Sequence, residues 1–165
     1  TNAYINSILN RKTSDEQNIS VNKGKEVFSD NIINIISFEV TDHNNVDVNP
    51  NLNIKLIFKI TKTISELMIG FHFKDKYGQL ILSDVISRNI DELSTEHNIQ
   101  LDATFTIPKL NNGKYFFSYS IAEGTEIHHS QHYWEHDVFS FDVHSNEHRY
   151  GIVKLDTSNV ELKNI

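Results

Sequence analysis

Apolar and polar residues alternate with a period of two along most of the chain. A β-strand points successive side chains to opposite faces, so each alternating run predicts a strand with one face in a core and the other toward solvent. Six runs show this pattern: Ile36–Val40, Leu52–Ile60, Leu67–Phe73, Ile99–Ile107, Tyr115–Ile121 and Phe139–Val143. Two shorter apolar segments follow at Ile152–Leu155 and Val160–Leu162.

Turn signals separate these runs. Lys76-Tyr77-Gly78 predicts a hairpin turn, and Asn111-Asn112-Gly113 predicts a turn before the strand at Tyr115. The segment Ser83–Asn98 has no clear alternation and is expected to be a long loop. Several strands with regular turn punctuation predict an all-β sandwich or barrel.

The start of the chain differs from the rest. Residues 1–25 are mostly polar and are interpreted as a leader or linker, in which Tyr4, Ile5, Ile8 and Leu9 have the spacing of a short helix. Residues 26–165 are then expected to form one β-sandwich domain. A chain of 165 residues fits a single ordinary domain.

Composition narrows the choice of partners. The formal net charge is −7, which argues against nucleic acid and against an anionic membrane surface. There is no cysteine, so disulfides and thiolate metal sites are excluded. No apolar run reaches the ~20 residues of a membrane span. The net charge does not exclude a neutral ligand, nor a ligand bound in a pocket that has its own local charge.

The outward positions of three predicted strands form a candidate binding face. If these strands are neighbours, one sheet face carries an aromatic ring among short polar groups, which suits a sugar cleft. An ordinary solvated sheet face is the alternative. The outward residues are His72, Lys74, Phe116, Ser118, Ser120 and Ser140.

A second candidate is the aromatic and histidine-rich segment 128–137. Tyr133 and Trp134, the single tryptophan, could stack on sugar rings beside His136. A core role for Trp134 is the competing interpretation. On a helix, His128, His132 and His136 would share one face and could bind zinc or iron, but the strand that follows makes a helix doubtful.

Motifs for nucleophilic catalysis and for phosphate loops are missing. The chain has no Gly-x-Ser-x-Gly elbow, no Gly-x-Gly-x-x-Gly loop and no Gly-x-x-x-x-Gly-Lys-Ser/Thr loop. We therefore expect no catalytic residues and no cofactor.

The order of several segments resembles the C-terminal domain of Wzt, the ATP-binding subunit of ABC transporters that export bacterial O-antigen polysaccharide. The resemblance covers about Gly24 to Val153. The most telling pieces are the hairpin Ile69–Leu80 and the turn Pro108–Tyr115, which has the pattern Pro-x-Leu-x-x-Gly-x-Tyr. Asp137–Val143 and Gly151–Val153 follow in the same order.

This resemblance implies an antiparallel sandwich of jelly-roll or immunoglobulin-like type. It implies binding of the non-reducing end of an O-polysaccharide, and a homodimer that exchanges C-terminal strands. It also implies a cytoplasmic domain that is peripheral to the inner membrane, tethered to an ATPase domain and working with a membrane subunit. Two alternatives stay open: a generic β-sandwich protein-interaction domain, and a histidine-rich metal-dependent enzyme.

Overall fold

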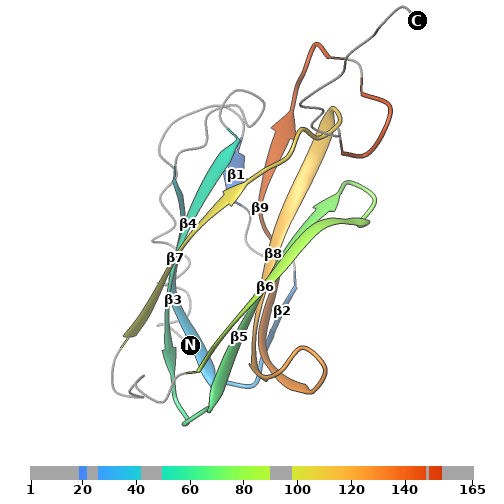
Figure 1. The fold of residues 1–165 in the computed structure, drawn as a ribbon. Helices are drawn as coiled ribbons and strands as arrows, with labels where there is room; N and C mark the ends of the chain where they lie inside the picture. The colour runs from blue at the N-terminus through green and yellow to red at the C-terminus, as the bar shows by residue number, and fades with distance from the viewer. Residues whose placement is uncertain (1–18, 22–25, 42–49, 90–97, 148, 154–165) are drawn as a thin grey trace, which may run out of the picture.

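Two antiparallel sheets face each other in the computed structural model, which describes residues 19–21, 26–41, 50–89, 98–147 and 149–153 (Figure 1). The larger sheet has the order β1-β9-β8-β5-β6, with β2 also paired to β9. Its strands are β1 (Ile19–Val21), β2 (Val27–Ser29), β5 (Glu66–Asp75), β6 (Leu80–Asn89), β8 (Gly113–Gly124) and β9 (His129–Val143). The smaller sheet has the order β3-β4-β7 and contains β3 (Ile33–Thr41), β4 (Asn51–Ile60) and β7 (Asn98–Thr106). The expected all-β antiparallel sandwich is confirmed.

Aromatic rings fill the space between the two sheets. Phe38 of β3 stacks on Tyr119 of β8, with ring centroids 5.5 Å apart. Phe117 and Phe139, on neighbouring strands of the larger sheet, stack at 4.8 Å. Each fully buried ring of this size contributes about 1.5–3 kcal/mol relative to an exposed one, so these contacts hold the sheets together.

The hairpin between β5 and β6 forms at the predicted turn. Gly78 has a φ of 80°, a conformation that side chains with a Cβ disfavour, and its N–H donates to the carbonyl of Asp75. The Asp75 carboxylate also accepts hydrogen bonds from the backbone N–H groups of Tyr77 and Gln79, each at 2.9 Å. A turn with its own hydrogen bonds sets the register of the two strands on either side.

Three sequence-based expectations differ from the structure. Ile36 does not face the core but is 36% exposed, because a β-bulge between Ile35 and Ser37 shifts the register of β3. The segment expected to be a loop after Ser83 instead continues β6 to Asn89. The larger sheet also begins before residue 26, since β1 pairs with Phe139–Phe141 of β9. The helix expected around residues 4–9 lies outside the described residues.

No part of the described chain forms a helix with the length and apolar character needed to cross a membrane.

Candidate functional site

The outer face of the larger sheet brings together most of the residues that the alternation pointed outward. Strands β9, β8 and β5 are neighbours in that order, as the binding-face prediction required. Trp134 lies opposite Ser120, and Ser120 lies opposite Gly70. One step along, Ser118 lies opposite His72, and Phe116 lies opposite both Lys74 and Ser140.

Trp134 is the centre of an aromatic cluster on this face. Its ring stacks on His72 with centroids 5.1 Å apart and planes 7° apart. It also stacks on His136 at 5.3 Å and 25°. All three side chains are half-buried. We call Trp134, His72, His136 and the adjacent Lys74 the aromatic platform.

Small residues make room for the aromatic platform. A Cβ added at Gly70 would lie 2.7 Å from Oγ of Ser120 and 3.0 Å from Nε2 of His72. The first distance is too short for any Cβ contact and the second is tight, so a larger residue at Gly70 would displace the Ser120 hydroxyl and press on the His72 ring. The glycine is needed here for space and not for a special backbone angle.

Lys74 fixes the hydrogen-bonding state of His136. The Nζ of Lys74 lies 3.1 Å from Nδ1 of His136. An ammonium group can only donate, so Nδ1 is the acceptor and the ring proton of neutral His136 sits on Nε2. The platform therefore has an imidazole N–H donor on β9 whose position is set by a lysine on β5, with β8 between the two strands.

Both platform histidines titrate below the ordinary range. Burial lowers the pKa of His72, and the charges of Lys74 and His136 lower it further. Burial and the Lys74 ammonium lower the pKa of His136, against the opposing effect of Glu26 and Asp137. Both rings are therefore mostly neutral at pH 7, while Lys74 carries the positive charge.

The expected serines are placed below the platform and not on its surface. Ser118 is 0% exposed, Ser140 is 1% exposed, and Ser120 is also buried. The Oγ of Ser118 accepts a hydrogen bond at 3.0 Å from the N–H of Asp137. Asp137 has a φ of 53° in a bulge of β9. Ser118 thus stabilises the bulge next to His136, and bulges of this kind re-aim side chains.

Tyr133 is not on the binding face, which corrects the interpretation of it as a sugar contact. It is 3% exposed and its hydroxyl donates to the Glu135 carboxylate at 2.9 Å. Tyr119 donates to the same oxygen at 2.9 Å. Because neighbouring residues of a strand point to opposite faces, Trp134 and Tyr133 cannot both be outside. Phe116 does face outward, but it is half-buried and less exposed than expected.

Phe28 is a member of this face that sequence reasoning missed. It lies opposite Trp134 on β2 and is 51% exposed. The three residues Val27–Ser29 are too short for a periodic signal, so their pairing with β9 becomes visible only in the fold.

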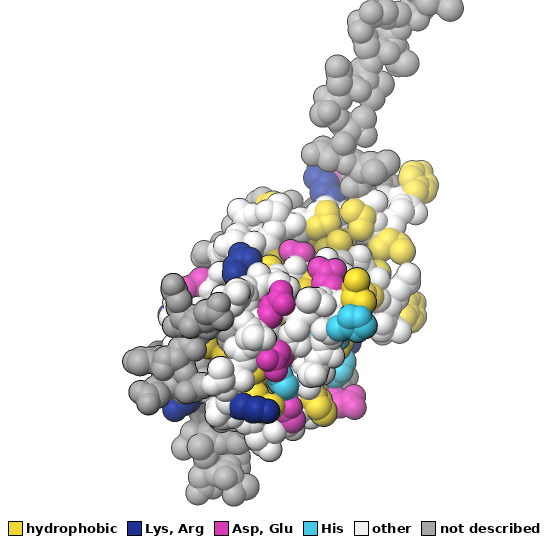
Figure 2. All heavy atoms as spheres, turned by 60° about the horizontal axis from the view of Figure 1, so that its bottom comes forward, with side chains coloured by type: hydrophobic (Ala, Val, Ile, Leu, Met, Phe, Trp, Pro, Cys, Tyr) yellow, Lys and Arg dark blue, Asp and Glu magenta, His cyan; other side chains and the backbone are white. Residues whose placement is uncertain are grey.

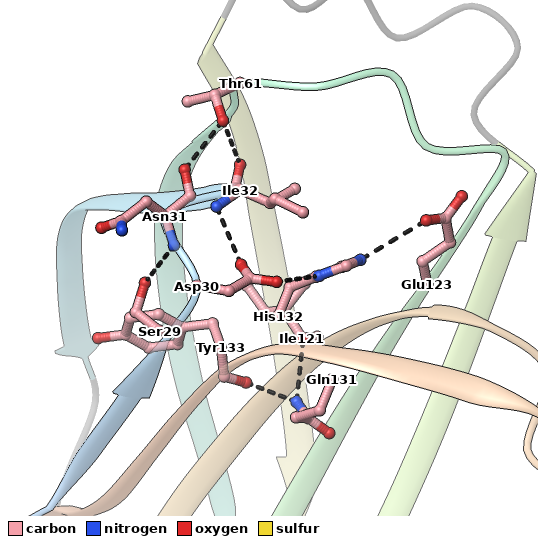
Figure 3. A network of polar contacts seen from close by, with 10 residues as sticks. All are labelled: Ser29, Asp30, Asn31, Ile32, Thr61, Ile121, Glu123, Gln131, His132 and Tyr133. Atoms are coloured by element: carbon pink, nitrogen blue, oxygen red, sulfur yellow. Dashed lines mark hydrogen bonds and ion pairs between the residues drawn. The ribbon is translucent and has the colours of Figure 1, made fainter.

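The three histidines of the metal hypothesis are separated in space. His128 is exposed in the turn before β9, and His136 belongs to the aromatic platform. His132 is buried, with Nδ1 2.7 Å from Asp30 and Nε2 3.6 Å from Glu123 (Figure 3). Within the described ranges, no group of three or more His, Asp or Glu side chains is arranged to hold a metal ion.

The Asp30–His132 pair joins the turn after β2 to the start of β9. Burial opposes ionisation of Asp30 and would raise its pKa. The carboxylate is hydrogen-bonded to His132 and to the Ile32 N–H, and it is attracted by the charge of His132. These interactions outweigh burial, so the pKa of Asp30 lies below its usual value. Thr61 continues the network by donating to the carbonyls of Asn31 and Ile32 (Figure 3). This cluster anchors the β2–β3 turn at one end of the sandwich.

The structure thus defines an antiparallel β-sandwich with a half-exposed aromatic cluster on the outer face of its larger sheet. The family model of the Wzt C-terminal domain matches residues 18–155, and the chain belongs to this family. A crystal structure of the C-terminal domain of Wzt has the same fold, with a TM-score of 0.66 and 15% identity over 83% of this chain and 88% of that one. No curated protein sequence matches the chain. Wzt domains are associated with the ABC transporters that export O-antigen.

Proposed function

We propose that the outer face of the larger sheet binds the non-reducing end of an O-polysaccharide and carries out no catalysis. The observation that supports this most is the stacking of His72 and His136 on Trp134. Aromatic faces bind the C–H faces of sugar rings, and the surrounding N–H groups can reach hydroxyls. Because Gly70, Ser118 and Ser120 support the rings from below, the face is organised before a ligand arrives.

Selection of a finished chain end follows from the same arrangement. A modified terminal residue can place a group against Lys74 or His136, whereas an internal residue would have to fit a further sugar in that space. Buried donors that lose their partner then penalise the wrong ligand. Such discrimination requires only differential binding, which agrees with a recognition domain of an export system.

The test is binding of purified oligosaccharide that carries the intact terminal group, measured by calorimetry. Because Trp134 is the single tryptophan, its fluorescence reports on this face alone. We expect saturable binding with a fluorescence change, and a loss of at least about tenfold in affinity, or about 1.4 kcal/mol, in Trp134→Ala. Tyr77→Ala, at an exposed aromatic of the β5–β6 hairpin, is the matched control and should bind normally.

Chain-end recognition is tested separately with the same oligosaccharide after removal of its terminal group. Equal affinity for the two ligands would contradict end recognition while leaving glycan binding intact. Binding that survives in Trp134→Ala with an unchanged fold would contradict the placement of the site.

We further propose a homodimer in which C-terminal segments are exchanged. β6 and β7 are the outer strands of their sheets, and between them runs a groove of about 340 Å³. Phe71, Phe73 and Phe105 line its apolar part. The residues Val160 and Leu162 alternate with polar Glu161 and Lys163, the pattern of a strand that could add to such an edge. A second copy of the chain is therefore the partner that this groove fits.

The family also suggests the wider setting. We propose that residues before β1 connect this domain to an ATP-binding domain, and that it works in the cytoplasm at the inner membrane next to the membrane subunit of the transporter. Membership of the Wzt C-terminal domain family supports this arrangement.

A further inference from the structure

We propose that His132 is a positioning residue that holds strand β2 in place at the edge of the larger sheet. Its protonated ring forms a clasp between Asp30, in the turn after β2, and Glu123, near the end of β8. Strand β2 carries Phe28, which lies opposite Trp134. The effect of the clasp on ligand affinity rests on the proposed glycan binding, whereas the clasp itself rests on contacts within the fold.

Strand β2 depends on few contacts. It pairs with β9 along Val27–Ser29, and no other strand in the described ranges pairs with it. At one end of this ladder, the N–H of His136 donates to the carbonyl of Glu26 at 3.0 Å. At the other end, the N–H of Asp30 donates to the carbonyl of His132 at 3.2 Å, and the Asp30 carboxylate reaches the ring. Because a short edge strand opens easily, its end contacts decide how firmly it is held.

The His132 ring lies between two carboxylates. Its Nδ1 is 2.7 Å from Oδ2 of Asp30, and its Nε2 is 3.6 Å from Oε2 of Glu123 (Figure 3). The residue is only 5% exposed, so water has little access to the ring. The pKa of Asp30 lies below its usual value, so this group is a carboxylate near neutral pH. Since a carboxylate only accepts hydrogen bonds, the short contact places a proton on Nδ1.

The second ring nitrogen distinguishes the two protonation states of His132. In the neutral ring, Nε2 carries a lone pair toward the Glu123 carboxylate, so that two acceptors oppose each other. This nitrogen is buried and has no hydrogen-bond partner among the described residues. In the protonated ring, Nε2–H is a donor, and both carboxylates attract the positive charge. The clasp is therefore complete only when His132 is protonated.

The charged groups that face the ring come from separate parts of the fold. Asp30 belongs to the β2–β3 turn and Glu123 to β8. Just before β5, the backbone N–H and the hydroxyl of Ser65 donate to Oε1 of Glu123, at 3.0 and 3.4 Å, which leaves Oε2 toward the ring. Within the described segments, no Lys or Arg forms an ion pair with either carboxylate. The ring proton is thus the positive charge that the two carboxylates share.

The surroundings of the clasp are acidic. The end of the sandwich with the β8–β9 hairpin comes forward in Figure 2, where acidic and histidine side chains lie close together and Lys and Arg side chains are scattered. The chain as a whole has a net charge of −7. A negative surrounding potential favours the protonated form of an imidazole.

The clasp makes the position of β2 depend on pH. Histidine is the side chain whose charge ordinarily changes between about pH 5 and 8. As the pH rises, loss of the Nε2 proton removes the attraction between His132 and Glu123, and Asp30 alone still holds the ring. Phe28 then leaves its place beside Trp134 more often. Protection of the β2 amides and affinity for the glycan should therefore fall together from pH 6 to pH 8.

Glu123→Gln tests the clasp without changing its shape. The amide oxygen of the variant can still accept from Ser65, while its NH₂ group takes the place of Oε2 and donates to Nε2 of neutral His132. The clasp then closes without the second proton. A His132→Ala exchange would remove the buried ring together with its proton and is a poorer test. Glu126→Gln, at an exposed position of the same hairpin, is the matched control.

Hydrogen exchange at the Asp30 amide measures the clasp directly. It is followed by NMR on the full chain at pH 6 and pH 8, as protection factors corrected for the intrinsic effect of pH. In the parent chain and in Glu126→Gln, we expect about tenfold less protection at pH 8, which corresponds to about 1.4 kcal/mol. In Glu123→Gln, protection should be the same at both pH values. Equal protection at pH 6 and pH 8 in the parent chain would overturn the clasp.

Calorimetry with the oligosaccharide that carries the intact terminal group then tests the link to binding. The parent chain and Glu123→Gln should bind equally at pH 6, and the variant should bind about tenfold more tightly at pH 8. His72 and His136 titrate in both chains, so their effect cancels in this comparison. Equal affinities at pH 8, with the expected exchange result, would overturn the link. Absence of binding in every chain would contradict the proposed function, and the exchange result would still decide the clasp.

Discussion

The imidazole of His72 lies parallel to the indole of Trp134, with planes 7° apart, although their strands are not neighbours in the sheet. Strand β8 runs between β5 and β9, so both side chains must lean across it. They can do so because β8 has Ser120 at this level and β5 has Gly70. The contact therefore depends on two small residues as much as on the two rings.

A methyl group at Gly70 should disturb this contact. In Gly70→Ala the added Cβ would lie 2.7 Å from Oγ of Ser120 and 3.0 Å from Nε2 of His72, so the Ser120 hydroxyl must shift and the His72 ring must give way by a few tenths of an ångström. We expect a loss of about tenfold in glycan affinity, measured by calorimetry, with the Tm changed by only a few degrees. The double variant Gly70→Ala/Ser120→Gly removes the shorter contact and should restore part of the affinity. Unchanged binding in Gly70→Ala would show that the position of His72 is unimportant.

Removal of the Lys74 charge should raise the pKa of both platform histidines. The ammonium disfavours a second positive charge nearby, so in Lys74→Met each ring should hold its proton to a higher pH than in the parent chain. Titration of the imidazole C–H signals by NMR measures this directly. Lys114→Met serves as the control, because Lys114 is paired with Asp142 on β9. Identical titration curves in the Lys74→Met and parent chains would contradict the proximity of the three groups.

The buried hydroxyl of Tyr119 should contribute to stability through Glu135. Tyr119→Phe leaves the core shape intact but removes a hydrogen bond to a buried carboxylate, so the free energy of unfolding should fall by about 1–3 kcal/mol. Denaturant unfolding provides the measurement. Tyr115→Phe, which removes a bond to the carbonyl of Asn111 in a partly buried site, should cost less. Equal losses in the two variants would argue against a special role of the carboxylate.

The raised pKa of Tyr119 also predicts how the free energy of unfolding changes at alkaline pH. Burial and the charge of Glu135 raise its pKa well above the usual value of a tyrosine. A group whose pKa is higher in the folded state than in the unfolded state stabilises the fold below the unfolded pKa and loses this effect as pH rises toward the folded one. The unfolding free energy should therefore decline above about pH 10, where unfolded tyrosines ionise, and less steeply in Tyr119→Phe.

Loss of the C-terminal segment should disturb the proposed dimer. A chain ending at His148 lacks Val160 and Leu162, so we expect a monomer by light scattering. That truncation also removes Arg149, which donates to the carbonyl of Leu110. The full-length variant Val160→Asp/Leu162→Asp avoids this problem and should also be monomeric, whereas Glu161→Ala should remain a dimer. A dimer in the double aspartate variant would refute strand exchange.

The outward positions of β5, β8 and β9 could be predicted from the sequence, because side chains along a strand point alternately to one face of the sheet or the other. Once Phe71 and Phe117 are in the core, His72 and Ser118 must point the other way. The sequence-based prediction failed at Ile36, where a bulge reverses the phase, and at Ser83–Asn89, a strand at the open edge of its sheet whose weaker burial leaves little alternation. It also assigned Tyr133 and Trp134 to one surface, which neighbouring residues of a strand cannot share.

The amino-acid pattern alone determined that this chain folds as a β-sandwich and that His72, Ser118 and Ser140 face away from the core, because the period of a strand is a local property of the backbone. Only the tertiary structure decided that Trp134 meets His72 and His136, that Lys74 bonds to His136, and that Phe28 lies beside Trp134. Strand order and bulges depend on how distant segments pair. Local periodicity carries no information about that pairing.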